Sequence, residues 1–572
     1  MLGVTVIILL SLGAIGGGAL VWLRTRDLPI VVRALIAQVP LGAAAALYLM
    51  LWTFSNAPSL DWNGGKLAPV LARFKADDPA HLDESRLYQD ADTGVMTAWI
   101  YGPIPALLFF PAALATRPTS AILIALFINV LSFFGPLLWA HVRLARTPVH
   151  PIDPQAPPAT ANVPFRMLVF LIFCWVTLNH ESMCRAGFMI AQDGPTIGFA
   201  VASIVLLSYQ RSPIVLILSA FCAVLACWCK QSAIPFLFVA PFYILIAEGL
   251  VAAFSYTLIL IIVGAVVSTM LMLSFGPVNM WFHMVQLPAA HGWENEARDG
   301  RPYLLFRAIL LLLTECLPTL GLVLLTLLIR HWLLPLGAAA TGARKQRFIA
   351  FARDNPWIMF PIAGIFMVPS ALLGFLKVGG YVNNFSLTHT FVALTASALL
   401  IRLYAQIRSL LRAPESATID APVSPSLVRA LVLAALALLV LWDWPDVLIK
   451  PKRAANMYAV IADPWNNQQE TIYEFAKSEP GLVYFPWNTL ATLLAERRLY
   501  HFEWGIHDRT EAGIKPSDEQ IIAHLPPKIR FVGYGPLHQG EEAHEIWFPQ
   551  WTARATDDRL KGFTIYTAPP QK

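Results

Sequence analysis

The stretch LYQDADTGVMTAWIYGPIPALLFF, from Leu87 to Phe110, joins a charged, turn-rich segment directly to an apolar one that prolines interrupt. Pro103 and Pro105 lie within it, and Pro111 follows. Each proline removes a backbone donor and disfavours helix at the residue before it. Such a segment suits a position at the membrane surface, covered by protein, better than a lipid-exposed span. We therefore expect 99–115 to be a juxtamembrane element that enters from outside and returns; an ordinary kinked span is the alternative.

The composition of the whole chain indicates a membrane protein. Of its 572 residues, 57% are hydrophobic and only 13% are charged, whereas a soluble domain carries about 25% charged residues. Apolar runs of about 20 residues, the length of a membrane-spanning helix, recur along most of the chain. We expect an α-helical polytopic membrane protein. No basic run with interleaved aromatic residues suggests a nucleic-acid partner.

The apolar runs predict about twelve spans. They are Val4–Leu23, 30–54, 119–140, 164–180, 195–210, 213–229, 233–249, 254–275, 303–329, 357–376, 387–408 and 427–447.

Basic residues predict the orientation of these spans. They cluster in four loops, at 24–33, 143–146, 344–353 and 402–412. All four loops fall on one face if 99–115 does not cross, and the positive-inside rule makes that face cytoplasmic. The opposite face then holds the first outer loop, 55–97, and the tail. This topology suits a bacterial inner membrane.

The tail, 450–572, has a different composition from the membrane part, 1–449. GLVYFPW (481–487), IRFVGYG (529–535) and GFTIYTA (562–568) are typical of short buried strands. TLATLLAE and SDEQIIAHL are typical of helices. The mixture predicts a small extracytoplasmic α/β domain. We expect no catalytic group in it, and we expect Glu503, His507 and Asp508 to form a solvated or acceptor-facing surface.

Several motifs occur in the order found in one family of membrane enzymes. SLDWNGG (59–65), RLYQDADTG (86–94) and YGPIP (101–105) lie in or just after the first outer loop. MIAQDGPTIGFAVASIVLLS, CWCKQSAIPFL and KVGGYVNNF follow. Together they resemble the GT-C class of integral-membrane glycosyltransferases, over roughly residues 30–410. The resemblance implies transfer of a hexosyl or pentosyl group from a polyprenyl-phosphate carrier.

The chemistry of this transfer indicates candidate catalytic residues. A carboxylate near the outer membrane surface can take the proton of the acceptor. Asp61 is the first candidate, because it matches the family's first-loop acid. Asp90 and Asp92 are alternatives, although their context also predicts a turn in which Asx side chains bond the backbone. A structural role for all three is the remaining alternative.

The resemblance also implies a substrate-binding set. It places Asp193 at the family's second acid, Lys230 and Lys377 at its lysine motifs, and Asn384 and Tyr101 in the remaining motifs. Lysines can stabilise a leaving phosphate, but an isolated lysine at the end of a span can also simply snorkel to water.

Two features of the outer loops extend this set. Arg298, like Arg301, is either a helper in phosphate binding or part of a solvated loop. His180, Glu181 and Arg185 lie near Asp193 in sequence without a fixed ligand spacing. We assign no metal ion, although a divalent cation stays open as a cofactor.

The expected function is transfer of a sugar to an extracytoplasmic lipid, glycan or protein of the cell envelope. A transporter or flippase is one alternative, but such proteins usually carry ionisable residues near the middle of their spans. A polysaccharide polymerase or assembly component is another. Activity with a defined carrier lipid would separate these functions.

Overall fold

The computed structural model describes sixteen parts of the chain. They are residues 13, 16–21, 23–27, 57–76, 86–146, 169–170, 173–174, 180–209, 212–293, 301–333, 344–410, 463–535, 550–551, 553–555, 557–560 and 562–567. Several predictions lie outside these residues: the spans 30–54 and 427–447, most of Val4–Leu23 and of 164–180, and Arg298.

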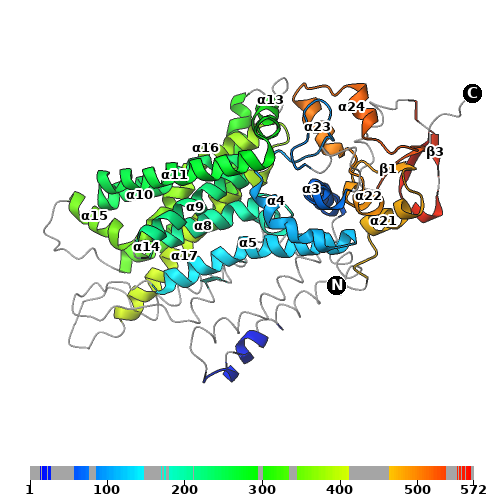
Figure 1. Ribbon diagram of the computed structural model, residues 1–572. Helices are drawn as coiled ribbons and strands as arrows, with labels where there is room; N and C mark the ends of the chain where they lie inside the picture. Colours follow the sequence, from blue (N-terminus) through cyan, green and yellow to red (C-terminus); the bar gives the residue numbers. More distant parts are fainter. Residues whose placement is uncertain are drawn as a thin grey trace, which may run out of the picture.

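Long apolar helices form the larger part of the molecule (Figure 1). Within the described residues, six are long and apolar enough to cross a membrane, or seven if the bent pair α7 and α8 counts as one span. The multi-pass helical architecture thus follows the sequence, whereas twelve spans are not confirmed. The long helices are α5 (Pro118–Arg146), η3 with α10 (Gln231–Phe238, Val239–Glu248), α11 (Leu250–Phe275), α14 (Arg301–Leu333), η5 with α16 (Pro356–Ile358, Met359–Leu376) and η6 with α17 (Val382–Phe385, Ser386–Leu410).

Shorter helices complete this part of the chain. They are α7 (Glu181–Phe188), α8 (Asp193–Leu207), α9 (Pro213–Cys229), α12 (Pro277–Trp281), the π-helix η4 (Phe282–Gln286), α13 (Leu287–Ala290) and α15 (Arg344–Asp354). The predicted spans 195–210 and 213–229 correspond to α8 and α9.

Burial differs strongly between the spans. In η6 with α17, 89% of an 18-residue stretch, about the length of a membrane span, is buried inside the molecule. In α11 the buried share of such a stretch is 17%. Large apolar side chains of α11, such as Phe254, Ile261 and Leu273, are exposed on the outside of the helices. A hydrocarbon environment, rather than water, would accommodate such a surface. The helix α17 is therefore central, and α11 lies at the periphery.

The proline-interrupted segment forms two short helices, α4 (Ile104–Phe109) and η2 (Phe110–Leu114). The apolar helical stretch Ile104–Leu114 is too short to count among the candidate spans. Gly102 precedes it, and a Cβ atom there would lie 1.6 Å from the carbonyl oxygen of Trp228. Only glycine therefore lets the segment pass so close to the end of α9.

The C-terminal part contains a four-stranded mixed sheet in the order β1-β2-β4-β3. β1 is parallel to β2, and the other two pairs are antiparallel. Its strands are β1 (Val483–Tyr484), β2 (Phe531–Tyr534), β3 (Ala553–Ala555) and β4 (Thr564–Thr567). The accompanying helices are α21 (Gln468–Ser478), α22 (Thr489–Glu496), α23 (Glu503–Glu511), α24 (Asp518–Ala523) and η7 (Asp558–Leu560). The three predicted strands and two predicted helices are confirmed; β3, α21 and α23 had not been predicted.

Helix α3 (Ala57–Lys75), in the first outer loop, lies between the long helices and the C-terminal part (Figure 1). Its close approach to the C-terminal part depends on Gly65, where a Cβ atom would lie 2.2 Å from the ring of Phe502. On another side, the Asn63 side chain accepts the backbone N–H of Ile190 at 2.7 Å. Helix α3 is thus fixed to both parts of the molecule.

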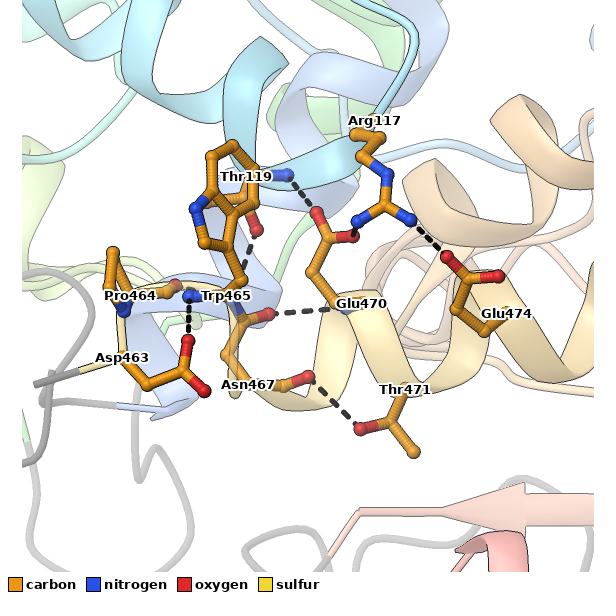
Figure 2. Close-up of polar contacts among 9 residues, drawn as sticks. All are labelled: Arg117, Thr119, Asp463, Pro464, Trp465, Asn467, Glu470, Thr471 and Glu474. Atoms are coloured by element: carbon orange, nitrogen blue, oxygen red, sulfur yellow. Dashed lines mark hydrogen bonds and ion pairs between the residues drawn. The ribbon is translucent and has the colours of Figure 1, made fainter.

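A second junction links α21 to the start of α5 (Figure 2). The Glu470 carboxylate accepts the backbone N–H of Thr119 at 3.0 Å and lies 3.3 Å from the Arg117 guanidinium. The Asn467 side-chain amide donates to the Thr119 hydroxyl at 3.0 Å. Asn467 also caps α21 by accepting the Glu470 N–H. The C-terminal part is therefore held against the end of a span by a network of polar contacts.

The opposite end of the long helices carries residues from the predicted cytoplasmic loops. Arg143 and Arg402 line one small cavity there, together with Trp357. Helix α15 also lies at that end, far from the sheet (Figure 1). Residues of three of the four predicted cytoplasmic loops therefore lie at the same end, and the assignment of this end to the cytoplasm stays a prediction.

Candidate functional site

A buried lysine of α3, Lys66, lies where α3 meets the segment before α4. Its ammonium donates to the backbone carbonyl of Ala98. It also lies 4.7 Å from the ring centroid of Trp62 and 4.8 Å from that of Tyr101. Two aromatic faces and one carbonyl stabilise the cation without neutralising it. Lys66 is therefore available to interact with an anion.

A buried ion pair joins the start of α8 to the end of α9. The Lys230 ammonium is 2.7 Å from one oxygen of Asp193, and both side chains are buried. The other Asp193 oxygen accepts the side-chain amide of Asn383 at 3.0 Å. Asp193 is the first residue of α8, where the helix dipole favours a negative charge. The structure thus brings together two of the residues that sequence analysis selected.

The segment that contains Tyr101 adjoins an apolar pocket. The pocket has a volume of about 660 Å³ and is lined by residues of α9, η3, α11, α12 and η4. Gln231, one of the lining residues, donates to the carbonyls of Ile100 and Met284, both at 2.8 Å. The ring of Tyr101, the next residue after Ile100, contacts Lys66. Val278 and Trp281, also in the lining, are largely exposed, so the pocket opens on the outside of the helices.

Asp508 of α23 adds a carboxylate to this region. It is 4% exposed, and one of its oxygens lies 3.9 Å from the Nε2 atom of His291. Its charge acts on both Lys66 and Tyr101. Burial raises the pKa of Asp508, and the Lys66 ammonium opposes that rise. Burial lowers the pKa of Lys66, while the negative charges of Asp508 and Asp193 oppose that decrease.

Asp61, the first candidate for the base, contacts the C-terminal part. It is fully buried, and its carboxylate accepts the side-chain amides of Gln469 at 3.1 Å and Asn488 at 2.6 Å. Gln468 donates to it as well. Three amides of the C-terminal part thus surround the carboxylate. In this arrangement Asp61 connects α3 to the C-terminal part, and its catalytic role stays a prediction.

Asp90 and Asp92 lie in the turn that their sequence predicted. Asp90 accepts the backbone N–H groups of Asp92 and Thr93, both at 3.0 Å, and the Thr93 hydroxyl. These hydrogen bonds lower the pKa of Asp90. Asp92 is exposed, and both carboxylates act on Arg509. The pair therefore stabilises the loop and its contact with α23.

Lys377 and Asn384 both make contacts that stabilise helix ends. The Lys377 ammonium donates to the carbonyls of Ala289 and His291, each at 3.0 Å. Asn384 donates to the carbonyl of Gly374 near the end of α16. Asn384 also lines the small cavity beside Asp193 and Lys230, but it is the preceding residue, Asn383, that binds Asp193.

The three charged or titratable residues that lie near Asp193 in sequence, His180, Glu181 and Arg185, make other contacts. Glu181 pairs with Arg185 at 2.9 Å, and His180 lies 3.9 Å from Glu315. Across the described parts of the chain, no group of three or more His, Cys, Asp or Glu residues could hold a metal ion.

Sequence reasoning missed Lys66 and Asn383 and placed Asp508 on a solvated or acceptor-facing surface. The signal available in the sequence for Lys66 was its position directly after the motif SLDWNGG. For Asp508 the chain offered no local signal, because only the docking of α23 buries it.

Comparisons with known proteins gave three similar structures. No family model and no curated protein matches the sequence. The fold is similar to ArnT from Cupriavidus metallidurans bound to undecaprenyl phosphate, with a TM-score of 0.45 and 14% identity over 93% of this chain and 99% of that one. The oligosaccharyltransferase of Archaeoglobus fulgidus in the apo form aligns at a TM-score of 0.34 and 12% identity, over 86% of this chain and 67% of that one.

The third structure is AglB, an oligosaccharyltransferase from Archaeoglobus fulgidus, in complex with an inhibitory peptide and a dolichol-phosphate. It aligns at a TM-score of 0.35 and 12% identity, over 84% of this chain and 66% of that one. At these TM-scores the similarities carry no argument about the activity of this chain, and the function is argued below from its own site.

Proposed function

We propose that this protein is a membrane glycosyltransferase of the GT-C type, which moves a hexosyl or pentosyl group from a polyprenyl-phosphate carrier to an acceptor outside the cytoplasm. One observation carries the proposal. An apolar pocket of about 660 Å³, open on the outside of the helices, lies beside the segment whose Tyr101 ring contacts a buried lysine, Lys66. The pocket suits an isoprenoid chain, and the lysine suits its phosphate.

The polar residues described above can each serve one requirement of the transfer. Lys66 can stabilise the negative charge that develops on the leaving phosphate. Lys230, oriented by Asp193, adds positive charge at the outer end of α9. Tyr101, whose ring contacts Lys66, can position the headgroup. Lys377 and Asn384 support the site by holding the ends of α13 and α16.

A transporter or flippase agrees less well with the charge distribution. Asp193 is the first residue of α8, and Lys230 directly follows α9. Both therefore lie at helix ends, whereas a transported ion or solute usually binds near the middle of the spans. Glu315 lies deeper, within α14, but it is bound to Ser182 at 2.6 Å.

The test uses the purified full-length protein in nanodiscs with polyprenyl-phosphate sugars labelled in the sugar. Acceptors are envelope lipids, glycans and proteins tested in turn. We expect acceptor-dependent transfer of label from the carrier. Lys66→Gln should reduce transfer at least tenfold, whereas Arg73→Gln, at the exposed end of the same helix, should not. Movement of intact carrier across the bilayer without cleavage would instead establish a flippase, and the proposal would fail.

A further inference from the structure

The buried carboxylate of Asp508 has one oxygen without a hydrogen-bond partner. Asp508 is 4% exposed, and its Oδ2 atom makes no hydrogen bond within the described residues. Its other oxygen has only the 3.9 Å approach of His291. A carboxylate that is buried and incompletely bonded costs free energy. Asp61 shows the contrast, because its buried carboxylate accepts three amides. The cost at Asp508 is explained if the carboxylate has a function.

Helix α23 is held firmly, so Asp508 cannot simply turn away. His291 Nε2 lies 3.0 Å from the backbone oxygen of Asp508. The Phe502 N–H donates to the Met96 carbonyl at 2.9 Å, just before α23 begins. A Cβ atom at Gly505 would lie 2.7 Å from the backbone of Met96 and Thr97. The helix therefore packs backbone to backbone against the first outer loop, and this contact directs Asp508 inward.

The charged and titratable groups that face Asp508 come from several elements. Lys66 belongs to α3, Tyr101 precedes α4, and His291 follows α13. Arg509, the next residue of α23, donates instead to the Ala91 carbonyl and lies 5.3 Å from the ring of Phe282. The positive charge of Lys66 acts on Asp508 and opposes the rise of its pKa. The His291 pKa is lowered by burial, which favours its neutral form.

We propose that Asp508 is the catalytic base of the transfer and that the C-terminal part thereby supplies a catalytic group. This inference rests on the proposed function. The acceptor is a hydroxyl or an amine, and its oxygen or nitrogen forms the new bond to the anomeric carbon of the sugar. The bond from that carbon to the phosphate oxygen breaks, and its electron pair stays on the polyprenyl phosphate. Asp508 takes the acceptor's proton on Oδ2 and later loses it to water.

This assignment gives Lys66 and Asp508 complementary roles. Lys66 bears the positive charge that stabilises the leaving phosphate, and Asp508 bears the negative charge that receives the proton. Each charge also opposes the shift that burial causes in the pKa of the other group. The assignment differs from the sequence-based expectation, which placed the base in the first outer loop and no catalytic group in the tail.

The experiment measures transfer by full-length wild type, Asp508→Asn and Asp508→Glu in nanodiscs. Asp518→Asn is the control, because Asp518 is an exposed aspartate of the same part of the chain. We expect Asp508→Asn to lower kcat by about 10²- to 10⁴-fold, the usual contribution of a general base. The KM for the carrier should change little, and Asp508→Glu should recover part of the activity. Thermal unfolding confirms that each variant is folded.

The pH dependence of kcat provides a second readout. In wild type, kcat should fall as pH decreases through the pKa of Asp508, and residual activity of Asp508→Asn should lack this fall. An active wild type with Asp508→Asn within threefold of it and with the same pH profile would overturn the inference and leave the proposed function standing. A wild type without transfer to any acceptor, from any polyprenyl-phosphate sugar, would overturn the proposed function and the inference with it.

Discussion

Glu470 of α21 accepts the backbone N–H of Thr119 at 3.0 Å, so a carboxylate of the C-terminal part caps the N-terminus of the span α5 (Figure 2). The N–H groups of a first helical turn have no partner within the helix, and a negative charge there is favoured. The contact therefore couples the folding of two parts that are far apart in sequence.

Glu470→Ala should destabilise the protein by about 1–3 kcal/mol, because it removes a cap and a charged hydrogen bond. Glu474→Ala is the matched control: Glu474 also pairs with Arg117, but its side chain is 54% exposed against 6% for Glu470. Exposed pairs contribute about 0–1 kcal/mol. Thermal unfolding in detergent measures both. Equal losses in the two variants would show that the cap contributes nothing.

The pair of Asp193 and Lys230 predicts a non-additive result. Both side chains are buried and the ion pair is 2.7 Å long. Lys230→Ala should cost about 3–5 kcal/mol, because it leaves an unpaired buried charge. Adding Asp193→Asn should recover part of the loss, which a double-mutant cycle measures as a coupling energy. If the two single losses simply add, the side chains do not depend on each other.

A substitution of Asp61 distinguishes a structural role of this carboxylate from the catalytic role that the sequence predicts. Asp61→Asn should destabilise the protein, because its new amide donors would face those of Gln469 and Asn488. We expect a loss of about 1–3 kcal/mol, measured by thermal unfolding, with exposed Asp518→Asn as the control. A variant as stable as wild type but inactive would return the catalytic role to Asp61.

The backbone contact of Gly102 predicts a steric effect. In Gly102→Ala the new Cβ atom would lie 1.6 Å from the Trp228 carbonyl oxygen, so the segment before α4 or the end of α9 must move. At Gly135, inside α5, nothing lies within 4 Å of the same atom. Gly102→Ala should therefore lower the unfolding temperature and reduce transfer, and Gly135→Ala should do neither. Wild-type behaviour of Gly102→Ala would contradict the close packing.

Composition and periodicity predicted those elements of the fold that depend mainly on their own local sequence. The apolar spans and the helix α22, at TLATLLAE, follow from composition and periodicity. Helix α3 does not, because Gly64 and Gly65 weaken it and contacts with Gln469 and Phe502 are what fix it. The candidate site was predicted in part: Asp193 and Lys230 do meet. Lys66 and Asp508 could not be paired from the sequence, because only tertiary docking brings them together.

The buried pair of Lys66 and Asp508 predicts how stability depends on pH. Burial raises the pKa of Asp508 from 3.8 to about 7, so between these values the folded state binds more protons than the unfolded state. Stability from this group should therefore fall as pH rises from about 4 to about 7. Burial lowers the pKa of Lys66 from 10.5 to about 8, so its contribution should rise again above about 8. The two groups therefore contribute least to folding stability near neutral pH, where catalysis needs both charges.

The measurement is the unfolding free energy of wild type minus that of Asp508→Asn, taken from pH 4 to pH 9 in the same detergent. Other groups titrate equally in both proteins, so the difference isolates this pair. It should fall between about pH 4 and pH 7, because only wild type must ionise a buried carboxylate there. Asp518→Asn should give no such slope, since Asp518 is exposed. A flat difference for Asp508→Asn would mean that the carboxylate is solvated in the folded protein and that the pair with Lys66 does not form.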